Sequence, residues 1–295
     1  MTGSFVQIHY HNRTGGVTAV MRRYAAAFDG AGRAAATRNL VVAGTETSLC
    51  GESAELIDMP RCAYAQHKTM SEFLRARDIL MHSLGGLVCD PSMPRPVRVV
   101  GHNLTLGKNL ALSSAFAAIA RRHASDRNLR FYSVVHDFAE EGRAHMVRQI
   151  SRAEQWGWPM WDDLYASGAR VRFVSVSPRN TRILRRAGLP AICLLNPVEE
   201  SAPARGRLSR RKRARIAGGL GRLARIDGTR FDPDLPSFLY PVRIISRKNI
   251  LEAILVCCLS GGATCLRAVR PMHPKIASCT GRFSHSAANM TFRWC

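Results

Sequence analysis

Arg243 and Lys248 have the types and the spacing to hold a phosphorylated ligand. Arg243 belongs to an expected strand, 240–246, and Lys248 lies in the loop before an expected helix, 249–256. Two cations at a strand end and in the following loop can both reach one diphosphate, and the Arg guanidinium can do so with two hydrogen bonds. Arg247 could take the place of Lys248. The alternative is a solvated basic surface, which is common in a chain with a net charge of +22.

A pair of glycines near the start of the chain suggests a second phosphate contact. Gly15 and Gly16 separate the apolar segment 5–10 from the segment 17–28, whose apolar residues recur at helical spacing. Glycine lets the backbone approach a ligand closely, and the N-terminus of a helix offers free N–H groups to an anion. An ordinary tight turn would explain the same pair.

Two His-containing pairs follow expected strands. His136 and Asp137 come directly after the apolar segment 130–135, and His102 and Asn103 end the segment 97–102. A His at a strand end can orient an incoming hydroxyl or act as a base near neutral pH. A capping or packing His would fit the position equally well.

These side chains need a scaffold that brings strand ends together. Short apolar segments alternate with helical ones, which is typical of a parallel α/β sheet of the Rossmann-like type. Ligands of such sheets bind at the carboxyl ends of the strands. The expected strands are 5–10, 40–43, 79–84, 97–102, 130–136, 171–177 and 191–195, and the expected helices are 17–28, 110–124 and 178–187.

Composition excludes several classes of protein. The chain has nine Cys, an odd number, with no Cys-x-x-Cys pair, which argues against a disulfide framework and a zinc site. The N-terminus lacks the charged and long apolar regions of a signal peptide, and the sequence has no apolar run of about 18–20 residues that could span a bilayer. A cytoplasmic location is therefore expected.

Charge divides the chain. Residues 201–295 hold 18 of the 43 Lys and Arg but only four of the 21 Asp and Glu. Within them, 201–225 contains nine basic residues and no acidic one, which would suit an anionic membrane face. Nucleic acid is disfavoured because no aromatic residues interleave with the cations. The expected organisation is a Rossmann-like domain at 1–200, a basic interdomain linker at 201–236, the start of a second Rossmann-like domain at 237–258, and a disordered or frame-shifted tail at 259–295.

The ordered set of motifs over residues 1–256 resembles the retaining GT-B glycosyltransferases of the family-4 type. The resemblance rests on five motifs in sequence order: Gly15-Gly16, His136-Asp137, Ser175-Val-Ser177, Asn196-Pro-Val198, and Arg243 with Lys248. Each motif alone is loose, and the order adds specificity.

The resemblance implies two Rossmann-like domains, the first for a sugar or glycan acceptor and the second for a UDP- or GDP-linked sugar donor. Gly15, Gly16, Arg243 and Lys248 would contact the donor diphosphate, and His136 would lie near the reacting sugar as the catalytic residue. His102, Asn103 and Asp137 would belong to the acceptor side. The cations would stabilise the leaving diphosphate, so no metal or other cofactor is expected.

The sequence departs from that family in its last part. The family places acidic residues in the second domain to bind the donor sugar and ribose, but no Asp or Glu follows Glu252 here. We therefore expect this incomplete chain to be inactive or nearly so. Two other classes stay open: a non-catalytic α/β module that binds an acceptor or partner, and a basic protein that binds polyanions or a membrane surface through 205–215.

Overall fold

The chain divides into two compact units, Met1–Glu199 and Glu200–Cys295. A computed structural model describes residues 3–30, 37–44, 53–141, 143–197, 209–226, 232, 237–239, 249–259 and 263–265. Arg243 and Lys248, most of the expected tail 259–295, and the expected strand at 240–246 lie outside these residues.

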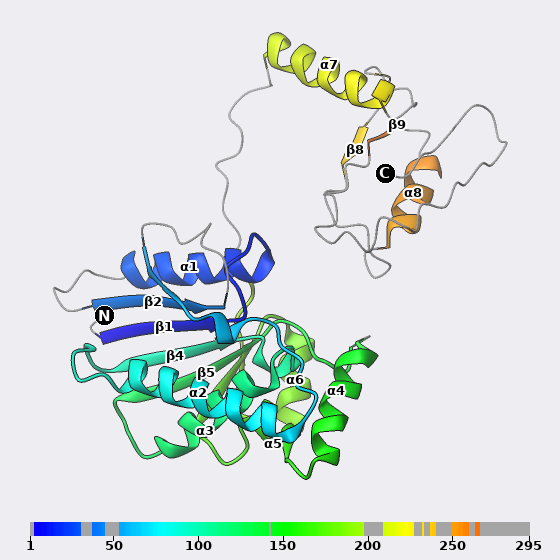
Figure 1. The fold of residues 1–295 in the computed structure, drawn as a ribbon. Coiled ribbons are helices and arrows are strands. Elements are labelled where there is room, and N and C mark those ends of the chain that lie inside the picture. Colours follow the sequence, from blue (N-terminus) through cyan, green and yellow to red (C-terminus); the bar gives the residue numbers. More distant parts are fainter. Residues whose placement is uncertain are drawn as a thin grey trace. The chain divides into compact units, whose positions relative to one another are not determined.

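The first unit is built on one seven-stranded sheet in the order β3-β2-β1-β4-β5-β6-β7, and every neighbouring pair is parallel (Figure 1). This is the Rossmann-like α/β sheet that the alternating sequence predicts. Because β1 and β4 are neighbours, the chain changes its direction of winding between them, and ligands favour such a point. The strands are β1 Gly3–His9, β2 Thr37–Ala43, β3 Glu55–Asp58, β4 Val97–His102, β5 Leu129–Val135, β6 Val171–Ser175 and β7 Ala191–Cys193.

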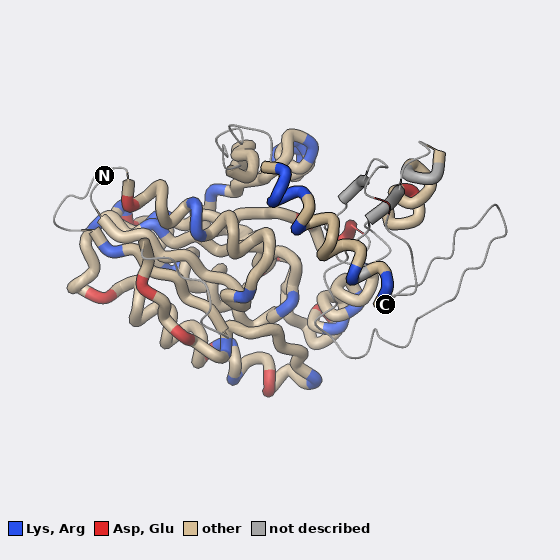
Figure 2. The backbone as a smooth tube through the Cα atoms, turned by 90° about the horizontal axis from the view of Figure 1, so that it is seen from above, with Lys and Arg blue, Asp and Glu red and all other residues tan. Residues whose placement is uncertain are grey.

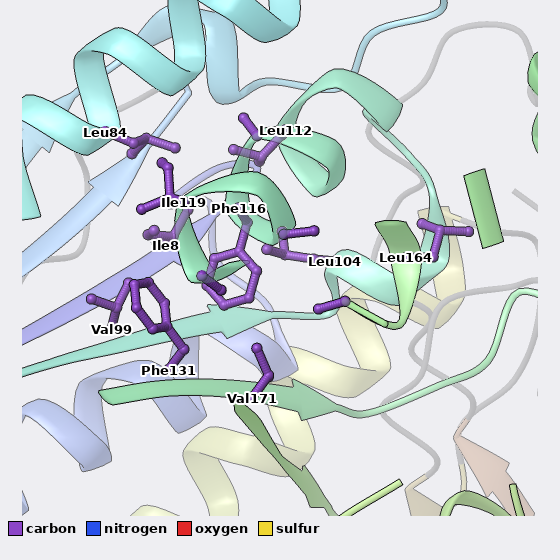
Figure 3. Close-up of a cluster of buried hydrophobic side chains, with 14 of the residues drawn as sticks. Ile8, Leu84, Val99, Leu104, Leu112, Phe116, Ile119, Phe131, Leu164 and Val171 are labelled. Atoms are coloured by element: carbon purple, nitrogen blue, oxygen red, sulfur yellow. The ribbon is translucent and has the colours of Figure 1, made fainter. Parts of the chain in front are cut away.

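Helices cover both faces of this sheet, and alternate strand residues supply the two cores. On one face, α2 (Met70–Cys89), α3 (Leu110–Arg122) and α5 (Met160–Leu164) enclose the larger core, in which Phe116 and Phe131 meet edge to face at 5.8 Å (Figure 3). On the other face, α1 (Gly16–Gly30) covers a smaller core. That core contains Val100, Val134 and Val174, with Phe5 and Tyr24 packed against it.

The strand expected at 79–84 is wrong, because these residues lie in the middle of helix α2. The side chain of Thr69 accepts the N–H of Glu72, and the Glu72 carboxylate accepts the N–H of Lys68, which together cap the start of the helix. Buried residues then recur at helical rather than alternating positions: Phe73, Leu80, Leu84 and Val88. Gly85 and Gly86 continue this helix instead of ending a strand.

The structure also adds elements that the sequence patterns did not indicate. These are β3, α5, two short 3₁₀ helices, η1 (Pro60–Cys62) and η2 (Leu104–Leu106), and α4 (Ala144–Gln155). The remaining expected elements are confirmed within a few residues, including α6 (Pro178–Arg186), which Gly188 follows at a φ of +76°.

The described part of the second unit contains α7 (Arg210–Ile226), α8 (Ile250–Leu259) and a parallel pair of short strands, β8 (Ser237–Leu239) and β9 (Ala263–Cys265). The helix expected at 249–256 corresponds to α8. None of the described helices is long and apolar enough to cross a bilayer.

The buried carboxylate of Asp163 links helices α3 and α5. Asp163 of α5 accepts hydrogen bonds from Arg121 Nη1 at 2.6 Å, from Trp158 Nε1 at 2.7 Å and from the Ser114 hydroxyl. The side chain of Asp163 is 3% exposed, and that of Arg121 is 34% exposed. A buried anion is tolerated only when it is paired and its lone pairs are used, and Asp163 meets both conditions.

We expect Asp163→Asn to lower the free energy of unfolding by about 2–4 kcal/mol, somewhat less than for a fully buried pair because Arg121 is partly solvated. Asp162→Asn is the matched control, since Asp162 is exposed on the same helix, and it should change stability by less than about 0.5 kcal/mol. Urea unfolding of both variants measures the difference. Equal stabilities would show that the Asp163 network contributes nothing.

Candidate functional site

Chemistry-bearing side chains gather where β1, β4 and β5 end, on both sides of the point where the winding changes. His9 ends β1 and is followed by Tyr10 and His11, His102 ends β4, and His136 follows β5. Parallel strands place these residues at one edge of the sheet. The four His rings form two pairs. His9 and His11 meet edge-on with centroids 5.0 Å apart, and His102 and His136 are stacked with centroids 5.9 Å apart.

Asn103 connects the ends of all three strands. Its backbone adopts a left-handed conformation (φ 59°), and its N–H donates to the carbonyl of Val134 at 2.8 Å. Its carbonyl accepts the Tyr10 hydroxyl at 3.1 Å. Its side-chain Oδ1 accepts the backbone N–H of His136 at 2.9 Å and that of Asp137 at 3.3 Å. Asn103 is buried, so in this arrangement it positions the His136-Asp137 pair rather than presenting its own amide at the surface.

The hydrogen bonds of His9 and His102 fix which ring nitrogen carries the proton. His9 Nδ1 lies 3.0 Å from the carbonyl of His102, which can only accept, so Nδ1 is the donor. Gln7 donates its amide to the carbonyl of Met21 and therefore turns its oxygen toward His102 Nε2 at 3.0 Å, so Nε2 is the donor there. The remaining nitrogens, His9 Nε2 and His102 Nδ1, are buried acceptors with no protein partner.

Burial keeps these rings neutral. Desolvation is the largest effect and lowers the pKa of His9 to about 3, and it lowers the pKa of His102 well below its usual range. Neighbouring His residues lower both pKa values further. His102 is fully buried, so in this arrangement it supports the site from below rather than facing a ligand.

His136, the predicted catalytic residue, lies at this edge and is partly exposed. Burial lowers the pKa of His136 to about 4, against a smaller opposing effect of Asp137. Its Nε2 is buried without a protein partner. A general base works best when its pKa is near the working pH, so a neutral imidazole with this pKa is better suited to hydrogen bonding or orienting a hydroxyl than to abstracting a proton.

Asp137 is held by a nearby cation. Arg143 Nη2 lies 2.7 Å from Asp137 Oδ2, and Arg143 Nη1 donates to the carbonyl of Phe138 at 2.8 Å. The carboxylate is 42% exposed, so it is fixed in position but accessible.

Gly15 and Gly16 lie at the start of α1 and are exposed. Neither has a positive φ, and a Cβ at Gly16 would meet nothing within 4 Å. The packing of the described chain therefore does not require glycine here. The first turn of α1 carries no acidic residue, which leaves its N–H end favourable to an anion.

Four residues of this edge were not selected from the sequence: His9, His11, Tyr64 and Lys108. The rule that selected His102 and His136, a His at a strand end, also applies to His9 and His11. Tyr64 and Lys108 had no comparable signal, because each belongs to a loop whose position depends on long-range contacts. Among the described residues, no group of three or more His, Cys, Asp or Glu is arranged to hold a metal ion.

No family model matches the chain. It is 26% identical over 265 residues to mannosylglucosyl-3-phosphoglycerate synthase from Petrotoga mobilis, covering 88% of this chain and 48% of the relative. The chain therefore spans about half the length of this curated relative.

Two solved structures have a similar fold at 12% identity. The catalytic domain of starch synthase IV from Arabidopsis thaliana, bound to ADP and acarbose, gives a TM-score of 0.56 over 91% of this chain and 69% of its own. A glycosyltransferase from Rickettsia africae gives 0.50 over 94% and 63%. At this coarse level the chain is glycosyltransferase-like, and its sheet is Rossmann-like.

The neutral His cluster predicts a pH dependence of stability. The folded-state pKa values lie below the ordinary value of about 6.5, so the unfolded chain takes up protons first as the pH falls. We expect the free energy of unfolding to fall between pH 7 and pH 5, with each such His contributing a slope of up to about 1.4 kcal/mol per pH unit. Most carboxylates stay ionised in this window.

Urea unfolding of His9→Asn at several pH values isolates one member, because Asn can replace the Nδ1 donor without titrating. The slope between pH 7 and pH 5 should be shallower than in the parent chain. His145→Asn, at an exposed position of α4, should leave the slope unchanged. An unchanged slope in His9→Asn would mean that the pKa of His9 does not differ between the folded and the unfolded chain.

Proposed function

We propose that the chain derives from a retaining GT-B glycosyltransferase that transfers a sugar from a UDP- or GDP-linked donor to an acceptor in the cytoplasm. The first unit would hold the acceptor, and the second would hold the donor. The observation that supports this proposal best is the convergence of His136, Asp137 and the Gly15-Gly16 loop at the carboxyl edge of a Rossmann-like sheet in a glycosyltransferase-like chain.

The roles follow from charge and position. The neutral ring of His136 would form a hydrogen bond with a hydroxyl of the reacting sugar, while Asp137, fixed by Arg143, would accept hydrogen bonds from the acceptor. Gly15 and Gly16 would let the donor diphosphate approach the N-terminus of α1. Arg243 and Lys248 would stabilise that diphosphate as it leaves, a task that needs no bound metal.

The acceptor is a sugar or glycan in the simplest form of the proposal. The name of the curated relative adds a second chemistry, since 3-phosphoglycerate carries both a phosphate and a carboxylate. An acceptor with an anionic group would also suit a chain of net charge +22.

We further propose that this chain turns over slowly. Residues 253–295 contain no Asp or Glu, so they supply no carboxylate to hold the donor sugar and ribose. Without hydrogen-bond acceptors for those hydroxyls, donor affinity should be weak.

The test measures release of UDP or GDP from a panel of nucleotide-sugars by the full chain. We expect rates far below the usual value of about 10 s⁻¹, and a further loss of about 10–100-fold in His136→Ala. His145→Ala should match the parent. Turnover at an ordinary rate would overturn the proposed weak activity, and equal release by His136→Ala and the parent would remove His136 from the mechanism. Any glycoside formed should keep the anomeric configuration of the donor.

A second role is favoured by helix α7. Seven of its 17 residues are Lys or Arg and none is acidic, and four of the basic residues are consecutive, 210–213. Figure 2 colours Lys and Arg blue along the backbone. Ile216 is 51% exposed on the same helix. We propose that α7 binds the surface of an anionic membrane, where each basic residue contributes about 1 kcal/mol.

Co-sedimentation with vesicles tests this second role. The full chain should bind vesicles that contain phosphatidylserine, and this binding should weaken as the salt concentration rises. It should not bind vesicles of phosphatidylcholine alone. Replacing Arg210, Arg211 and Lys212 by Gln should weaken binding strongly. The matched control replaces the exposed Arg127, Arg130 and Arg172 of the first unit by Gln. If the two triple variants lose binding equally, general charge and not α7 explains the attraction.

A further inference from the structure

Tyr64 is an exposed aromatic side chain held in a fixed position at the carboxyl edge of the sheet. It is 50% exposed, yet its ring contacts those of Tyr10 and His11, each with centroids 5.2 Å apart. The ammonium of Lys108 lies 4.3 Å from the centre of the same ring. An exposed side chain is usually free to change rotamer, so this many partners indicates a surface built to present the hydroxyl in one place.

The backbone around Tyr64 is fixed as firmly as its ring. Asn109 donates its side-chain amide to the carbonyls of Arg61 and Ala63, at 2.9 Å and 2.8 Å, and the N–H of Ala65 donates to the carbonyl of Lys108 at 3.1 Å. Gly44 permits this loop to lie against the end of β2, because a Cβ there would be 2.0 Å from Ala63 N. The loop with Tyr64 and the turn with Lys108 therefore form one rigid support.

The hydrogen bonds of Tyr64 leave its own proton available. The N–H of Arg13 donates to His11 Nδ1 at 3.4 Å, so His11 Nε2 carries a proton and donates to the Tyr64 oxygen at 3.0 Å. Lys108 Nζ donates to the same oxygen at 2.8 Å. A hydroxyl oxygen accepts two hydrogen bonds, and both are now used, so the Tyr64 O–H can only donate outward. Lys108 keeps two further N–H donors.

The local charge is positive. In the described part of the chain, no salt bridge joins Lys108 to a carboxylate. Burial lowers the pKa of His11, and the charges of Lys108 and Arg13 lower it further. A surface with several donors and a cation that pairs with no described carboxylate has the character of an anion site.

We propose that His11, Tyr64 and Lys108 form a subsite for a phosphate group of the acceptor. The assignment of the phosphate to the acceptor rests on the proposed function, whereas the anion site itself does not. The Tyr64 hydroxyl and two Lys108 N–H groups would donate to the phosphate oxygens, and His11 would hold the Tyr64 hydroxyl in place.

Isothermal titration of the full chain with 3-phosphoglycerate, in the absence of any nucleotide-sugar, tests the subsite. Lys108→Met should weaken binding about tenfold, equivalent to about 1.4 kcal/mol, and Tyr64→Phe about threefold. The matched control is Lys68→Met, because Lys68 is an exposed lysine whose side chain lies outside this subsite, and it should bind as the parent does. Glycerol, which lacks the anion, should not bind. Circular dichroism confirms that each variant is folded.

A second readout follows the ring of His11 by proton NMR. Binding of the anion should raise the pKa of His11, since a nearby negative charge favours the protonated form. The same rise should appear with inorganic phosphate and be absent in Lys108→Met.

Competition separates the two sources of phosphate. If UDP or GDP displaces 3-phosphoglycerate, and Lys108→Met weakens binding of the nucleotide instead, the subsite belongs to the donor. The assignment to the acceptor is then overturned. Equal binding by Lys108→Met and Lys68→Met overturns the subsite itself. If the chain transfers sugar but Lys108→Met does not weaken anion binding, the subsite is refuted and the proposed function stands. If Lys108→Met weakens anion binding but the chain transfers no sugar, the subsite stands and the proposed function is refuted.

Discussion

The arrangement of side chains at the carboxyl edge of the sheet depends on the hydrogen bonds of one residue, Asn103. A left-handed turn directly after β4 lets this residue face β1 through its carbonyl and β5 through its N–H and its Oδ1. Parallel strands are joined by crossover connections and not by hairpins. Contacts such as those of Asn103 therefore fix the position of one strand end relative to the next. Without them, His136 and Asp137 would leave β5 in no defined direction, and the arrangement of this edge would be lost.

Electrostatics divides the edge into two layers. Below, His9 and His102 are buried and neutral, because the cost of desolvating an imidazolium exceeds any gain from their hydrogen bonds. Above, Lys108 and Arg143 carry charge close to the surface, one beside Tyr64 and the other paired with Asp137. The neutral layer supports the edge from within the fold, and the charged layer can supply donors for anions. Such donors would suit the anionic acceptor that we propose.

Sequence patterns predicted the Rossmann-like sheet and the edge on which His102, Asn103, His136 and Asp137 meet, because strand ends follow from local periodicity. They failed at 79–84, where the Thr69–Glu72 cap outside the apolar run decides that the segment is helical. They also missed Tyr64 and Lys108, which come together only through Asn109 and the close approach at Gly44. Long-range contacts of this kind leave no local pattern. The predicted roles of Arg243 and Lys248 remain predictions, since both residues lie outside the described part of the chain.

The structure places a neutral, hydrogen-bonded His cluster at the ends of β1, β4 and β5. Long-range ¹H–¹⁵N correlation spectra of the His rings at neutral pH test it most directly, because they report which nitrogen carries the proton. We expect a proton on Nδ1 of His9 and on Nε2 of His102, and neither ring protonated on both nitrogens at pH 6. Rings that are imidazolium at pH 6, or that exchange freely between tautomers, would contradict it.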